Sequence, residues 1–286
     1  ALEKWEFLKD YKYSVIFTCD DFSSTLKRAK EILPLKDTYE NDYLYTSFVK
    51  PVAYSMDGYY FLKFNLAYAA IHPLTQEEFL TKYPFLVVFH EKGELIEFRF
   101  DILKRVFLSD KKEPTIYSNL IAEMSDYFKE HFECDLIPLN LDFMVNVCKR
   151  DENVKLIAQS MKLPNGGNAQ LDVGNNQEYI LPFIGELRSL LNDNQAELEK
   201  VPDFREALEQ FMFEMEEMSD YPWIELLWEN EIKTRSNRVK FVFNYMNKSY
   251  CLIQYYYSNV LIGMERMNYV IEYIVNHRND DTTQNE

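Results

Sequence analysis

Three residues of the N-terminal half have types and spacing that could form a divalent-metal site. Asp57 lies in an Asp-Gly turn before the expected strand "YYFLKFNL", and Glu97 and Arg99 lie in the later strand "LIEFRF". Two carboxylates on neighbouring strands can hold Mg²⁺, which orients or stabilises the groups that react in phosphodiester cleavage. The third member of such a site is usually Lys, whereas Arg99 is held in its charged form and cannot take a proton. A Glu97–Arg99 ion pair explains these residues more simply. A nuclease or phosphodiesterase in this half is therefore the alternative hypothesis, with Mg²⁺ as its cofactor.

Other motifs that would indicate an enzyme are absent from the sequence. The four cysteines and four histidines show no C-x-x-C, H-x-x-H or H-E-x-x-H spacing, so no zinc site or redox motif is predicted. The chain also has no G-x-S-x-G, no P-loop and no G-x-G-x-x-G. A serine hydrolase, a P-loop NTPase and a dinucleotide-dependent oxidoreductase are therefore disfavoured, and the sequence favours a protein that is not an enzyme and has no resident metal or cofactor.

The second candidate site is the acidic stretch "EALEQFMFEMEEMSDYPWIELLWENE", residues 206–231, which holds nine carboxylates and no basic residue. Its apolar residues suggest two interpretations. The residues Phe204, Leu208, Phe211, Met215 and Met218 follow a 4-3-4-3 spacing, which is typical of one helix face packed into a core, with the carboxylates in water. Met212 and Phe213 lie off that stripe, so the stretch has more apolar surface than one buried face needs. A protein partner could cover the excess.

In the binding interpretation, the contact residues are Glu214, Glu217, Asp220, Trp223 and Trp228. The net charge of −16 favours a partner with a basic surface and disfavours direct nucleic-acid binding, which depends on Lys and Arg. Self-association is left open. No apolar run approaches the roughly 20 residues of a membrane helix, so no membrane contact is expected.

The elements that position these residues are expected to form an α+β fold. Region 1–162 should contain a mixed or antiparallel sheet with packed helices. In its "FLVVFH"/"LIEFRF" hairpin, the side chains Ile96, Phe98 and Phe100 should face a core, while Glu97 and Arg99 face water. A capping box at 75–78 predicts a short helix up to Tyr83, and an amphipathic helix should begin at Pro114.

The C-terminal part is expected to be mainly helical. An Asn- and Gly-rich stretch, 163–178, is interpreted as a loop or linker before a region that spans 179–286. Within that region Pro222 should start a second short helix, and a β-hairpin should occupy 238–258.

The leading hypothesis is an acidic cytoplasmic protein that binds a protein partner. Widely spaced free cysteines and the lack of an apolar leader are consistent with the cytoplasm. The richness in Tyr, Phe and Asn resembles that of proteins from AT-rich bacterial genomes and their mobile elements. One concrete form of the hypothesis is therefore an inhibitor or regulator of a nucleic-acid-handling protein, encoded by a phage or plasmid.

Overall fold

The computed structural model describes residues 2–31, 44–71, 74–103, 115–151, 153–163, 166–174, 184–229, 236–256 and 263–278. The chain forms two compact units. Unit 1 contains residues 1–140 and 244–286, and unit 2 contains residues 141–243. Eleven strands dominate the described residues, and the strand pairings within each unit are antiparallel.

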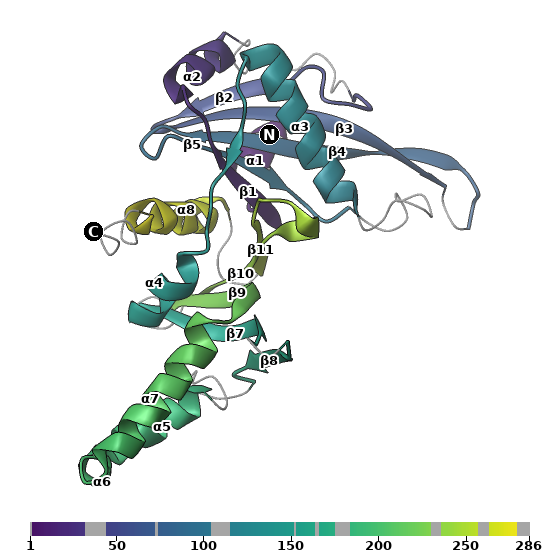
Figure 1. The fold of residues 1–286 in the computed structure, drawn as a ribbon. Helices are drawn as coiled ribbons and strands as arrows, with labels where there is room; N and C mark the ends of the chain where they lie inside the picture. The colour runs from purple at the N-terminus through teal and green to yellow at the C-terminus, as the bar shows by residue number, and fades with distance from the viewer. Residues whose placement is uncertain are drawn as a thin grey trace. The chain divides into compact units, whose positions relative to one another are not determined.

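The sheet of unit 1 has the order β2-β3-β4-β5-β1-β11, with the short strand β6 paired to β1 (Figure 1). Its strands are β1 (Tyr13–Thr18), β2 (Val52–Met56), β3 (Tyr59–Ile71), β4 (Glu78–His90), β5 (Leu95–Phe100), β6 (Ile137–Pro138) and β11 (Leu252–Tyr256). The longest ladder joins β3 to β4 from the Tyr59–His90 pair to the Ile71–Glu78 pair. Aromatic and β-branched residues are frequent in these strands, which suits a pleated and buried surface.

Helices cover the two faces of this sheet. They are α1 (Leu2–Leu8), α2 (Phe22–Lys30), α3 (Ile116–Phe132) and α8 (Glu265–His277), with a 3₁₀ turn, η3, at Tyr245–Asn247. Helix α3 packs on the aromatic face, where the Phe128 ring lies 5.7 Å from that of Phe98. Helix α8 packs on the opposite face, where its Asn268 accepts a hydrogen bond from Arg99.

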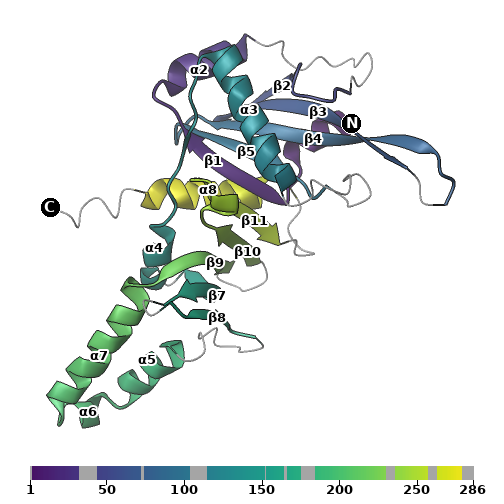
Figure 2. The ribbon, with the colours of Figure 1, turned by 45° about the vertical axis from the view of Figure 1, so that its right-hand side comes forward.

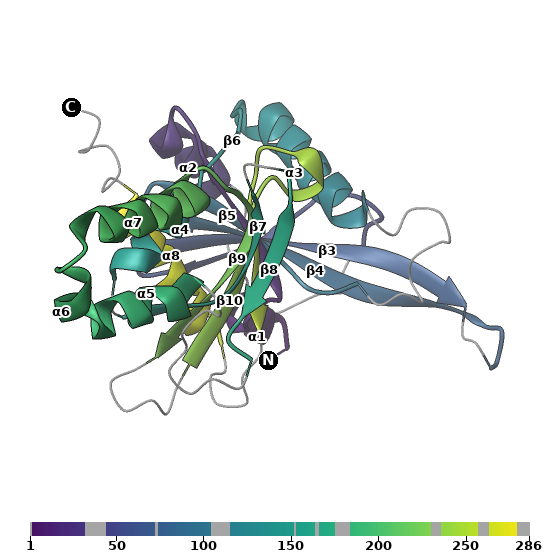
Figure 3. The same cartoon turned by 60° about the horizontal axis from the view of Figure 1, so that its bottom comes forward.

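Unit 2 is built on a smaller antiparallel sheet of order β10-β9-β7-β8. Its strands are β7 (Val154–Lys162), β8 (Asn168–Asp172), β9 (Asp220–Glu229) and β10 (Ser236–Val242), and α4 (Met144–Arg150) packs against β7 and β9. Three further helices, α5 (Ile184–Asp193), α6 (Gln195–Leu198) and α7 (Pro202–Glu217), form a helical hairpin that projects from this sheet (Figures 2 and 3). We call α5–α7 the arm.

The expected mainly helical C-terminal region is wrong. Residues 220–229, which include the helix expected from Pro222, form strand β9 instead. This strand is paired on one side with β10 and on the other with β7, and its run of Trp, Ile and Leu fills the core of unit 2. Tertiary pairing on both sides outweighs the helical spacing of Trp223, Leu226 and Leu227.

The short helix expected at 75–83 is also wrong. Strand β4 begins at Glu78, because β3 is long enough to pair with it along its whole length. The strand predicted over "YYFLKFNL" (β3), the β4–β5 hairpin and the amphipathic helix α3 are confirmed. Strand β11 lies within the range 238–258 that was predicted to form a hairpin, and β10 begins two residues before that range. The predicted division into 1–162, 163–178 and 179–286 stays a prediction, although strand β8 lies inside 163–178.

Candidate functional site

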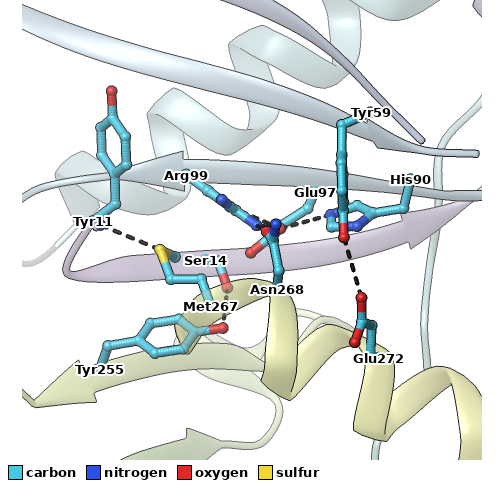
Figure 4. Close-up of polar contacts among 10 residues, drawn as sticks. All are labelled: Tyr11, Ser14, Tyr59, His90, Glu97, Arg99, Tyr255, Met267, Asn268 and Glu272. Carbon is cyan, nitrogen blue, oxygen red and sulfur yellow. Dashed lines mark hydrogen bonds and ion pairs between the residues drawn. The ribbon is translucent and has the colours of Figure 1, made fainter. Parts of the chain in front are cut away.

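The first candidate site lies on the face of the unit 1 sheet that α8 covers. The side chains of Glu97 and Arg99 point to this face, opposite Ile96, Phe98 and Phe100, as strand alternation predicts. The prediction that they face water is wrong, because both are fully buried. Asn268 of α8 lies over Arg99 and accepts a hydrogen bond from its Nη2 at 2.7 Å (Figure 4).

One oxygen of Glu97 is the centre of this cluster. Its Oε2 accepts hydrogen bonds from Arg99 Nε and His90 Nε2, both at 2.8 Å. Burial opposes ionisation of the carboxyl, but the charge of Arg99 and the hydrogen bonds from His90 and Arg99 outweigh burial, so the pKa of Glu97 lies below its ordinary value. Burial lowers the pKa of His90, which favours the neutral imidazole despite its bond to Glu97. The cluster is therefore a carboxylate paired with one guanidinium and one neutral imidazole.

A pocket of about 310 Å³ lies beside this cluster. It is formed by the β2–β3 turn, the start of β3, the end of β4, the β4–β5 turn and one side of α8. Asp57 and His90 line it, and so do Tyr59 and Glu272, which are joined by a hydrogen bond of 3.2 Å from the phenol to the carboxylate (Figure 4). Glu97 does not line the pocket, but its hydrogen bond with His90 Nε2 fixes the orientation of the imidazole.

The structure thus brings two of the three residues of the nuclease hypothesis into contact. Glu97 and Arg99 form an ion pair at 2.7 Å, while Asp57 lies in the pocket wall with His90. Within the described residues, no group of three or more His, Cys, Asp or Glu side chains could hold a metal ion. The charge of Glu97 is already balanced by Arg99, so this carboxylate has little left to offer a metal ion. Mg²⁺-dependent cleavage stays an untested prediction.

The second candidate site is the arm, and its apolar residues are exposed. The exposed fractions are 59% for Phe204, 49% for Phe211, 58% for Phe213 and 64% for Met218. Met212, which lies off the predicted stripe, is the buried one. Phe204, Phe211 and Met218 of the stripe are exposed, while Leu208 and Met215 are half-buried. The interpretation of the stripe as a buried core face is therefore wrong. Leu190 of α5 adds another exposed apolar side chain to the arm.

The arm is also strongly acidic. Residues 184–217 contain ten carboxylates and three basic residues, a net charge of −7. All three basic side chains form ion pairs within the arm, namely Arg188 with Glu216, Arg205 with Glu209 and Lys200 with Glu197. Most of the carboxylates thus remain available to a ligand of opposite charge.

The predicted contact residues are divided between the surface and the core. Glu214 and Asp220 are exposed, and Trp223 is half-buried beneath the ammonium of Lys240, 3.5 Å from the ring centroid. Trp228 is only 3% exposed and packs in the core near Phe241, so it cannot contact a partner directly. The side chain of Glu217 lies outside the described residues.

Sequence reasoning missed His90 and Asn268, which complete the buried cluster. A polar residue at the end of a strand carries no signal for its partner seven residues later. The pairing of Arg99 with Asn268 joins residues 169 positions apart. The only part of this cluster that the sequence indicated is the alternation in β5, which places Glu97 and Arg99 on one face of the sheet. The alternation does not show which element covers that face.

The fold and these sites define a protein of two antiparallel sheet units, with a buried ionic cluster in one and an acidic helical arm in the other. Neither a protein-family model nor a curated protein matches this chain at a significant level. Of the helices in the described ranges, none has the length and apolar character needed to cross a membrane.

Proposed function

We propose that this is a non-enzymatic binding protein whose arm engages a basic protein partner. The observation that carries the proposal is the exposure of Phe204, Phe211, Phe213 and Met218 among carboxylates on one projecting helix. Large apolar side chains gathered on an exposed surface with a polar rim are typical of interaction sites. A helix with such side chains suits insertion into a groove of a partner.

The magnitudes indicate that the contact needs both apolar and charged groups. Full burial of a Phe or Met side chain contributes about 1.5–3 kcal/mol, so four side chains that are half-exposed contribute about 3–6 kcal/mol. Association costs about 4–15 kcal/mol in lost freedom. The apolar side chains alone therefore barely offset this cost, and complementary charge must supply the remainder and direct the partner to the arm.

The sign of the charge selects the partner class. A second copy of this chain would bring another arm of net charge −7, so repulsion opposes arm-to-arm association. A phosphate backbone would be repelled for the same reason. A protein with an apolar groove bordered by Lys and Arg fits both features of the arm. Proteins that handle nucleic acids have such basic surfaces, which supports a role as an inhibitor or regulator of one of them.

The test compares capture of partners by three variants at two salt concentrations. The arm-charge variant carries Glu206→Gln, Glu209→Gln and Glu214→Gln, and the arm-apolar variant carries Phe211→Ser and Phe213→Ser. The matched control carries Glu77→Gln, Glu94→Gln and Glu130→Gln, which removes three exposed carboxylates from unit 1. Each is used as bait in lysate of the source cell, and the captured proteins are identified and quantified.

We expect a defined basic protein to be captured by the wild type and by the control, and to be lost with either arm variant. Capture should also fall steeply as salt rises, because exposed charges are screened over about 8–10 Å at 0.1–0.15 M. Capture that is unchanged by the arm variants, or that survives high salt undiminished, would refute the proposal.

A further inference from the structure

We infer that the pocket beside α8 in unit 1 is a binding site for a small organic cation, namely a primary amine with a short apolar body. The pocket is separate from the arm and was not predicted as a site from the sequence. The inference rests on a histidine that lines the pocket and is held by a carboxylate, on two further carboxylates in the wall and on an apolar side of limited size.

The histidine is His90, which lines the pocket and is only 5% exposed. Its Nε2 is 2.8 Å from the ionised carboxylate of Glu97, which can only accept a hydrogen bond, so Nε2 carries the proton. The other ring nitrogen, Nδ1, then carries a lone pair, which can accept a hydrogen bond from a ligand.

Two carboxylates give the pocket its charge. Asp57 lies in the β2–β3 turn, and Glu272 lies on α8, where it accepts the hydrogen bond from Tyr59. Among the described residues of the wall, Lys92 at the exposed β4–β5 turn is the one with a cationic side chain. An ammonium group has three donors and no acceptor, so it matches two carboxylates and an imidazole lone pair. An anionic ligand would meet the two carboxylates with only Lys92 to offset them.

The remaining wall limits the ligand to a short apolar body. Ile271 and Val275 of α8 form its apolar side, and the ring of Tyr59 stands at right angles to that of His90. The volume of about 310 Å³ is at the small end of the range of about 300–1,000 Å³ for small-molecule sites. Gly93 closes one edge, where a Cβ would lie 2.7 Å from Val275 Cγ2, so the turn approaches α8 closely.

The experiment titrates the full chain with three probes of similar shape, which are n-hexylamine, 1-hexanol and hexanoate, and measures affinity by calorimetry or ligand-observed NMR. The same titrations are made with Asp57→Asn and Glu272→Gln. The matched control is Glu94→Gln, which removes an exposed carboxylate from the β4–β5 turn without lining the pocket. Binding at His90 is followed by its imidazole NMR signals, assigned by comparison with His90→Gln.

We expect hexylamine to bind at least tenfold more tightly than hexanol or hexanoate, and to shift the imidazole signals of His90. Asp57→Asn and Glu272→Gln should each weaken hexylamine at least fivefold, and Glu94→Gln less than twofold. Equal affinity for hexylamine and hexanol, tighter binding of hexanoate, no binding of hexylamine, or equal weakening by all three carboxyl variants would each overturn the inference. The arm variants described above should leave hexylamine affinity unchanged, so this test is independent of the proposed partner.

Discussion

The buried cluster makes one strong prediction, which concerns Glu97→Gln. In the wild type, the Glu97 carboxylate balances the charge of Arg99, and both side chains are fully buried. The substitution keeps the shape of the side chain but leaves an uncompensated guanidinium in a low-dielectric environment. Loss of one partner of a buried ion pair costs about 3–5 kcal/mol of unfolding free energy. In chains somewhat smaller than this one, each kcal/mol of lost unfolding free energy lowers the melting temperature by about 2–4 °C. A loss of about 3–5 kcal/mol should therefore lower the melting temperature by about 6–20 °C.

The assay is thermal and urea unfolding followed by circular dichroism, with hydrogen exchange of β5 peptides to locate the change. Glu94→Gln is the control, because that carboxylate is exposed in the adjacent turn and its removal should change the unfolding free energy by less than about 0.5 kcal/mol. The double variant Glu97→Leu/Arg99→Met should recover much of the loss, because apolar replacement of a whole buried pair is often neutral. A Glu97→Gln protein within about 1 kcal/mol of wild type would refute the structural reading of this cluster.

Three further predictions concern single groups of unit 1. In the folded protein the pKa of His90 is below its ordinary value, so the unfolded chain takes up a proton on this histidine at a higher pH than the folded chain does. The unfolding free energy should therefore fall as pH drops below about 6.5, by up to about 1.4 kcal/mol per pH unit. A slope in His90→Gln equal to that of the wild type would contradict this. Gly93→Ala should cost about 1–3 kcal/mol by steric overlap with Val275, and Val275→Ala in the same chain should restore part of the loss, as measured by urea unfolding. The hydrogen bond with Cys134 outweighs burial and lowers the pKa of Cys19 to about 7, so the rate of Cys19 alkylation by iodoacetamide should rise with a midpoint near that pH. In Cys134→Ala the midpoint should move upward, and an unchanged midpoint would show that Cys134 has no such role.

Local patterns were sufficient for elements whose periodicity is complete. The alternation in "LIEFRF" predicted the faces of β5 correctly, and the stripe of residues after Pro114 predicted helix α3. The same alternation gave the wrong environment for Glu97 and Arg99, because what covers a face depends on a helix that begins at Glu265. No local rule carries that information.

Residues 204–229 show a second limit of sequence patterns. The spacing of Phe204, Phe211 and Met218 correctly predicts a helix through Glu217, but periodicity does not tell whether the apolar side packs on the same chain or on another. In β9, short runs of Trp and Leu fit both a helix and a buried strand, and the decision came from pairing with β7 and β10. These are the points at which tertiary contacts override local propensity.

The central claim, that the arm is the contact surface, is tested most directly by hydrogen exchange on the recovered complex. The deuterium uptake of peptides from α5, α6 and α7 is compared between the free protein and the complex purified at low salt. The account predicts strong protection of residues 184–217 in the complex, with β3–β5 unchanged. It predicts no such protection when the Phe211→Ser/Phe213→Ser variant is mixed with the purified partner. Protection that falls on other parts of the chain, with the arm exchanging as fast as in the free protein, would contradict it.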